Sequence, residues 1–172
     1  MNYCILVTNK KSTLHTMIID NKLLSQLADK ATNSVRKRAN YNFHQSNDDI
    51  LQRMLNMIQP YSYVQPHKHQ NPDKREAFII LQGRLLVVLF QNDGTIKQAT
   101  ILDRDKQVYG IEIPPHCYHT IVALKNNTCV YEVKDGPYDE LNDKQFAPWA
   151  PSENHTNSTV YLKQLLDRCL KD

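Results

Sequence analysis

The sequence predicts a mainly β, single-domain protein, a sandwich or a small barrel, with one helix near its start and another at its end. Short apolar runs follow one another between residues 51 and 133, and turn-forming residues separate them. Almost no helical periodicity interrupts these runs. A chain of 172 residues is a typical length for one domain. About eight strands in so short a stretch favour two packed sheets or a closed barrel.

The region before the strands is expected to hold one short helix. Apolar residues have helical spacing at Leu23, Leu24, Leu27 and Ala31. Asp20 or Asn21 is placed to cap this helix at its N-terminus. Residues 1–16 show no strong periodicity and are interpreted as a flexible extension or an added strand. Residues 38–47 are polar and irregular.

The strands are expected over residues 51–58, 61–65, 77–81, 84–90, 95–102, 107–113, 118–124 and 128–133. Asn92-Asp93-Gly94 and Lys125-Asn126-Asn127 are interpreted as hairpin turns. A polar segment follows Gly136-Pro137, and apolar spacing predicts a terminal helix over 159–170. The expected division of the single domain is an extension (1–16), a helix and arm (17–47), a barrel (48–138) and a C-terminal segment with its helix (139–172).

Composition argues against several classes of function. The formal net charge is only +3, and the one basic run, Arg36-Lys37-Arg38, is more typical of a solvated helix end than of a nucleic-acid interface. The four cysteines are scattered without metal-binding spacing, which favours reduced thiols in a cytoplasmic protein. No apolar run approaches the ~20 residues of a membrane span, so no membrane association is expected.

Histidines form the most informative pattern. His67 and His69 are two residues apart, so on a strand their side chains project from one face. Imidazole is a common ligand of transition metals, and His119 on a distant strand can supply a third. The sequence therefore predicts a metal site inside the β domain.

These residues resemble the two signature segments of the cupin superfamily. The first is a His-x-His pair followed by Glu and then Gly, here His67, His69, Glu76 and Gly83. The second is Pro-x-Gly-x-x-His, here Pro114 to His119, with His116 in the Gly position. The resemblance implies a double-stranded β-helix (jelly-roll) barrel and a metal held by His67, His69, Glu76 and His119.

Glu76 departs from this pattern, because six residues separate it from His69 where the superfamily usually has three or four. We expect the loop 70–75 to bulge outward and return Glu76 to the site as a ligand, or as a catalytic acid or base beside it. Glu76, Phe78 and Ile80 would then share the face that points inward.

A more specific resemblance, to the WbuC family of cupin-fold metalloproteins, covers nearly the whole chain from Met17. It rests on the segments 38–44, 52–56, 66–69, 112–114, 119–120, 134–138 and 146–151. That family is met in bacterial gene clusters for O-antigen and surface polysaccharide, and its reaction is not established. The resemblance implies a carbohydrate substrate, and cupins often form homodimers.

Donors of this kind suit one divalent transition metal, with zinc, nickel, iron and manganese as alternatives. Four further residues, His44, Arg53, Tyr63 and Arg84, are candidates for substrate binding. His44 follows an irregular loop that can close over the site, and Arg84 can bind a phosphate or carboxylate in a bidentate manner. Arg53 and Asn56 lie on opposite faces of their strand, so at most one points inward. Tyr63 is a hydrogen-bond donor for the rim.

Three functions stay open. The first is a metal-dependent enzyme that modifies a sugar or nucleotide-sugar as an isomerase, epimerase or oxygenase. The second is a non-catalytic module that uses the metal to bind a sugar or small acid. The third is a purely structural metal site.

Overall fold

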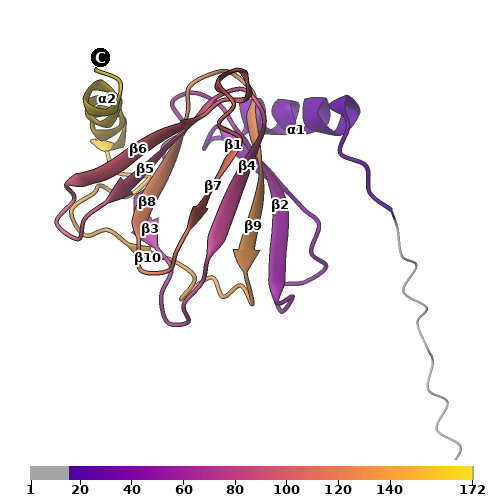
Figure 1. The fold of residues 1–172 in the computed structure, drawn as a ribbon, viewed down its shortest axis with the longest axis horizontal. Helices are drawn as coiled ribbons and strands as arrows, with labels where there is room; N and C mark the ends of the chain where they lie inside the picture. The colour runs from indigo at the N-terminus through magenta and orange to yellow at the C-terminus, as the bar shows by residue number, and fades with distance from the viewer. Residues whose placement is uncertain (1–15, 172) are drawn as a thin grey trace, which may run out of the picture.

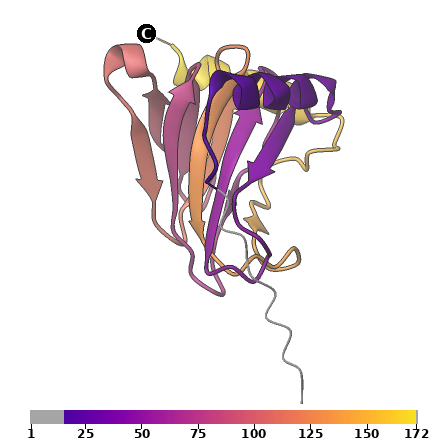
Figure 2. The same ribbon diagram turned by 90° about the vertical axis from the view of Figure 1, so that its right-hand side faces the viewer.

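The computed structural model describes residues 16–171, which fold into two facing antiparallel sheets of five strands each (Figures 1 and 2). The strand orders are β1-β2-β9-β4-β7 and β10-β3-β8-β5-β6. The strands are β1 (Arg38–Asn42), β2 (Leu51–Ile58), β3 (His67–Lys68), β4 (Glu76–Gln82), β5 (Leu85–Phe90), β6 (Ile96–Leu102), β7 (Gly110–Ile113), β8 (Tyr118–Ala123), β9 (Thr128–Asp135) and β10 (Gln145–Phe146). A short 3₁₀ helix, η1 (Arg104–Lys106), precedes β7. The mainly β prediction is confirmed.

The two expected helices cover the outer faces of the sheets (Figure 1). In α1 (Asn21–Asn33), the Asp20 carboxylate accepts a hydrogen bond from Leu23 N at 2.9 Å, so Asp20 is the cap. The buried face of α1 packs on Leu55 and Met57 of β2. α2 (Ser158–Cys169) packs Leu162 against the outer face of β5 and β8.

Two sequence predictions about strands are wrong. Residues 38–42 form β1, which pairs with β2 from Arg38↔Ile58 to Asn42↔Met54. Its polar composition makes it hard to recognise, because Arg38, Asn40 and Asn42 line a polar cavity and only Ala39 and Tyr41 pack against the core beneath α1. Residues 61–65 are largely buried but form no strand: Tyr61 is in a turn with a φ of 68°, and residues 62–65 pair with no neighbouring strand.

The two expected hairpins have different outcomes. Residues 92–94 do connect paired strands, β5 and β6, and Thr95 N donates to Asp93 Oδ1 at 2.9 Å in the turn. Residues 125–127 do not form a hairpin, because β8 and β9 belong to different sheets. That connection crosses between the sheets, an arrangement that local turn chemistry does not distinguish from a hairpin.

The interior changes from polar to apolar along β4 and β9. On β4 the inward residues run Glu76, Phe78, Ile80, and on the antiparallel β9 Glu132 lies beside Phe78 and Val130 beside Ile80. The apolar end forms the core between the sheets, with Leu85, Val87 and Leu102 fully buried among its members. The polar end is therefore free to form a site.

Three further predictions concern the chain as a whole. The extension 1–16 lies, except for residue 16, outside the described residues. Within 16–171, Cys117, Cys129 and Cys169 are free thiols, in agreement with the prediction of reduced cysteines. No helix of this part of the chain has the length and apolarity to cross a bilayer.

Gly83 provides a test of the crossing between the sheets. Its φ is +78°, and a Cβ there would lie 2.5 Å from Thr128 Oγ1 and 2.7 Å from Thr128 Cα. We predict that Gly83→Ala lowers the free energy of unfolding by about 2–4 kcal/mol, through backbone strain and overpacking. Urea denaturation measures this, and Lys97→Ala, at an exposed position of β6, should change it by less than about 0.5 kcal/mol. Equal effects of the two substitutions would contradict this account of the crossing.

Candidate metal centre

Four buried side chains meet at the polar end of the interior: His67, His69, Glu76 and His119. One potential ligand atom from each lies within 4.8 Å of all the others. His67 begins β3 and pairs directly with His119 on β8, while Glu76 begins β4 in the facing sheet. His69 follows the end of β3. The cluster thus joins both sheets.

Backbone carbonyls orient all three imidazoles. His67 Nδ1 lies 2.9 Å from Gln65 O, and His119 Nδ1 lies 3.0 Å from Cys117 O. His69 Nδ1 contacts the carbonyl oxygen of Asp143. Because a carbonyl only accepts, each Nδ1 carries a proton, and each ring in its neutral form presents the lone pair of Nε2.

These lone pairs face a carboxylate. His119 Nε2 is in direct contact with Glu76 Oε1, and His69 Nε2 lies 3.5 Å from Glu76 Oε2. In the neutral tautomer such contacts join acceptor to acceptor, and His69 Nε2, His119 Nε2 and Glu76 Oε1 have no hydrogen-bond partner among the described residues. A divalent cation bound between them would satisfy all three atoms, so the residues present suit a transition metal.

Electrostatics keeps His67 neutral and Glu76 ionised, while the Glu76 carboxylate favours a proton on His119 that a bound metal would displace. Burial lowers the pKa of His67, and the positive charge of Lys144 lowers it further. Burial has the same effect on His119, but the Glu76 carboxylate outweighs it and raises the pKa of His119. Burial alone would raise the pKa of Glu76, yet His119 and His69 outweigh it and hold that pKa well below its usual range. Glu76 therefore stays ionised.

The expected bulge of loop 70–75 brings Glu76 into the cluster. Loop and site are linked where His116 N donates to His69 O at 3.0 Å, and where His116 Nε2 lies 2.9 Å from Asp73 Oδ1. His116 has a φ of 65°, the left-handed conformation that favours Gly, which accounts for Gly at this place in the cupin signature. Its ring is exposed and lies outside the cluster.

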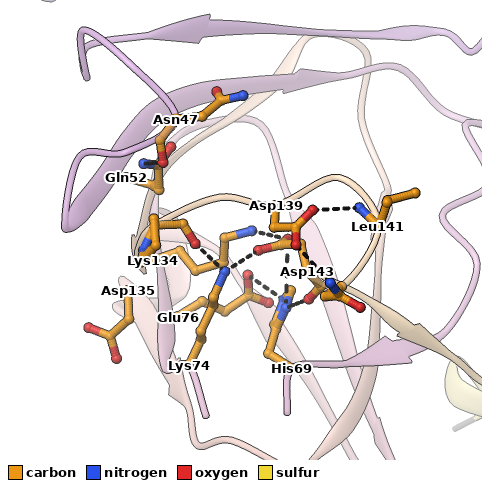
Figure 3. A network of polar contacts seen from close by, with 12 residues as sticks. Asn47, Gln52, His69, Lys74, Glu76, Lys134, Asp135, Asp139, Leu141 and Asp143 are labelled. Atoms are coloured by element: carbon orange, nitrogen blue, oxygen red, sulfur yellow. Dashed lines mark hydrogen bonds and ion pairs between the residues drawn. The ribbon is translucent and has the colours of Figure 1, made fainter. Parts of the chain in front are cut away.

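A buried ion network supports His69 from behind (Figure 3). The Asp143 carboxylate receives Lys74 Nζ at 2.7 Å on one oxygen and Lys134 Nζ at 2.5 Å on the other. Its side chain is 1% exposed. Burial would raise the pKa of Asp143, but the two lysines outweigh it and lower that pKa. The network fixes the residue whose carbonyl orients His69.

A cavity of about 330 Å³ opens beside the cluster, within the range of small-molecule sites. His67, Glu76 and His119 lie on its wall. Most of the other lining residues are polar: Arg36, Arg38, Asn40, Asn42, His44, Asn47, Gln52, Asn56, Glu132, Lys134, Tyr138 and Lys144. Apolar contacts come from Met54, Val64, Phe78 and Ile121.

Of the four residues expected to bind substrate, the structure brings only His44 to this cavity. Arg53 points away, toward Asp49 at 3.5 Å, and Asn56 takes the inward face of β2 instead. Tyr63 packs beneath α2 and donates its hydroxyl to Pro151 O at 2.8 Å.

Arg84 likewise lies away from the cavity. Its guanidinium forms a 2.9 Å ion pair with Asp103, next to the short helix η1. Arg84 directly follows Gly83 and therefore lies at the apolar end of the sheets. The conformation of the connection from β4 to β5 determines the direction of its side chain.

The sequence analysis missed several cavity residues. Glu132 and Lys134 alternate with outward residues of β9, so strand periodicity could have selected both as inward polar residues. Lys144 lies in a polar loop, where nothing in the local sequence indicates a role. Asn56 Nδ2 donates to Glu132 Oε2 at 3.1 Å and links β2 with β9 at the cavity wall.

Comparison with known proteins supports the fold and does not assign a reaction. Residues 19–102 match a family model described as a domain of unknown function (DUF6016). The capsular polysaccharide assembling protein CapF from Staphylococcus aureus is similar to this chain, with 23% identity over 62% of this chain and 28% of that one (TM-score 0.51). CapF bound to the inhibitor 3-isopropenyl-tropolone matches over 66% and 32% at 22% identity (TM-score 0.54).

The protein SO0799 from Shewanella oneidensis has only 9% identity but aligns over 86% of this chain and 98% of its own (TM-score 0.55). The fold is a cupin jelly roll. The chain spans less than a third of the CapF chains that it matches. No curated protein matches the sequence. The resemblance to the WbuC family stays a prediction.

A pair of histidines in the same segment tests the metal site. We predict that His119→Ala lowers the affinity for zinc, nickel, iron(II) or manganese at least about 100-fold, since loss of even an outer partner costs 10–100-fold. His116→Ala, three residues earlier and exposed, should leave the affinity unchanged. Chelator competition with elemental analysis measures both. Equal metal content of the two variants would refute the assignment.

The buried network makes a separate prediction about stability. Asp143→Asn leaves Lys74 and Lys134 without their counter-ion, so the free energy of unfolding should fall by about 3–5 kcal/mol. The exposed Asp167→Asn should change it by less than about 0.5 kcal/mol. Because the pKa of Asp143 is lowered in the fold, its stabilisation is complete above the unfolded pKa of about 3.9 and is lost as the pH falls through the folded value. Urea titrations at neutral and acid pH measure both effects, and an unchanged stability of Asp143→Asn at neutral pH would contradict them.

Proposed function

We propose that this protein is a metal-dependent enzyme that acts on a sugar or nucleotide-sugar, with chemistry of the isomerase, epimerase or oxygenase type. One observation carries the proposal. Three imidazole lone pairs and an ionised carboxylate converge at the wall of an open, polar cavity. Such a donor set, open on one side, is typical of a catalytic metal rather than a closed structural one.

His67, His69, Glu76 and His119 would hold the metal. When bound, the metal would supply a Lewis acid that polarises a carbonyl or hydroxyl oxygen of the substrate. The cluster is open to the cavity, which favours a catalytic metal over a structural one. His67, Glu76 and His119 line the cavity, and His69 lies behind them. Glu76 is the residue best placed to hold or accept a proton beside the substrate, since its carboxylate stays ionised.

Cavity polarity supports a carbohydrate as substrate. Asn40, Asn42 and Asn56 line the cavity with their amides, and His44 lines it as well. Amides donate and accept hydrogen bonds, as a substrate rich in hydroxyl groups requires. An apolar ligand would leave these groups without partners, at a cost in binding free energy.

The proposal also includes a biological setting, the synthesis of a surface polysaccharide. CapF, of which this chain matches 28%, is a capsular polysaccharide assembling protein, as its name states, and this supports the same setting here. The resemblance to the WbuC family supports the same setting, O-antigen or surface-polysaccharide synthesis in the cytoplasm. A homodimer belongs to this proposal as well.

A turnover screen tests the enzyme. We expect protein loaded with each of the four metals to alter at least one member of a panel of nucleotide-sugars and free sugars, as followed by mass spectrometry. Glu76→Gln should reduce that turnover at least about 100-fold, and Arg53→Ala, whose side chain points away from the cavity, should leave it unchanged.

Two results would argue against an enzyme. One is the absence of turnover across the panel with metal content confirmed. The other is a sugar that raises the melting temperature only with metal present and is recovered unchanged. The second result would support the alternative, a non-catalytic module that binds a sugar or small acid.

A further inference from the structure

Lys144 differs from the other cationic residues of the cavity. Arg38 binds Glu153 at 2.5 and 2.6 Å, and Lys134 is paired with Asp143 at 2.5 Å. Arg36 lies 4.0 Å from Glu153. Among residues 16–171, Lys144 has no ion-pair or hydrogen-bond partner for its side chain. Among the described residues that line the cavity, it is the one cation without an ion pair within 4.0 Å, although Glu132 and Glu76 attract its charge from farther away.

The backbone on both sides of Lys144 is firmly held. Residues 139–146 form a strap along the cavity. Asp143 anchors the strap through the buried lysine network, and Gln145 pairs with Lys68 as β10 adds to β3. Lys144 stands between these two anchors, so its side chain leaves a fixed point of the wall. Such preorganisation lowers the entropy lost on ligand binding.

Lys144 lines the same cavity as His67, Glu76 and His119. Its charge lowers the pKa of both His67 and His119, and it attracts Glu132 on the opposite sheet. Enclosure by the cavity walls lowers the pKa of Lys144 itself. Because solvent still reaches the side chain, we take Lys144 as charged at neutral pH.

This arrangement favours an anionic ligand once a metal is bound. A divalent cation and the ammonium group of Lys144 both add positive charge to the cavity, which Glu76 and Glu132 offset only in part. A ligand with a negative group between the two would relieve the repulsion and form a charge-assisted hydrogen bond to Lys144.

We propose that Lys144 is the anion-binding residue of this cavity, and that the substrate is an anionic sugar bearing a carboxylate or a phosphate. This rests on the proposed function and narrows its substrate class. Lys144 takes the charged group beside the metal cluster, while the amides of Asn40, Asn42 and Asn56 face the hydroxyl groups. Sugar acids and sugar phosphates share the required chemistry.

Calorimetric titration of the metal-loaded protein tests this with three probes: glucuronate, glucose 6-phosphate and glucose. We expect at least one anionic probe to bind more tightly than glucose. Lys144→Met should weaken that binding about 10-fold or more and leave the binding of glucose unchanged. Lys144→Arg should restore most of the affinity. Lys163→Met, at an exposed position of α2, is the matched control, and metal analysis and thermal melting verify that each variant is loaded and folded.

The proposal is overturned if glucose binds as tightly as both anions, if no probe binds, or if Lys144→Met binds the anions as the wild type does. The preferred anion identifies a carboxylate or a phosphate as the recognised group. The experiments distinguish a failure of this proposal from a failure of the proposed function. Anion binding that depends on Lys144 without any turnover would refute the enzyme alone, whereas turnover of a neutral sugar that Lys144→Met preserves would refute only the role of Lys144.

Discussion

Hydrogen bonds from three imidazole Nδ1 atoms to backbone carbonyls are the constraint on which this site depends. They fix the tautomer, so that every Nε2 lone pair points to one place. For His67 and His119 the acceptor is the carbonyl two residues earlier, so each segment orients its own histidine. For His69 the acceptor is Asp143, 74 residues away. The cluster is therefore complete only when the strap 139–146 is in place.

Charge compensation explains why a jelly roll tolerates such a polar interior. The apolar half of the space between the sheets stabilises the fold, and the polar half holds several of its charges in ion pairs. Asp143 neutralises part of the charge of two buried lysines, and Glu153 binds Arg38 at the cavity edge. Removing one partner of such an ion pair lowers the free energy of unfolding by more than the intact pair adds to it, because the remaining buried charge is left uncompensated. The same network links stability, strap position and the orientation of His69, so these properties are expected to change together.

Function has to be argued from the site, because one fold serves many reactions. The candidate ligands were predictable from two short signatures, and the structure brings all four together. Substrate contacts were far less predictable. Arg53 and Asn56 were equal candidates by strand alternation, and only the pairing of β2 with β1 and β9 shows which of them faces inward. Arg84 and Tyr63 have suitable chemistry but lie outside the cavity.

The sequence by itself determined the features that depend on neighbouring residues: both helices, the Asp20 cap, most strands, the turn at residues 92–94 and the spacing of His67 and His69. These follow from periodicity and from local hydrogen bonds. Only the tertiary structure decided that 38–42 is a strand, that 125–127 crosses between sheets, and that Lys144 stands beside the metal cluster. The physical reason is that strand pairing and charge compensation join residues far apart in the chain. The sequence around one such residue does not identify its partner.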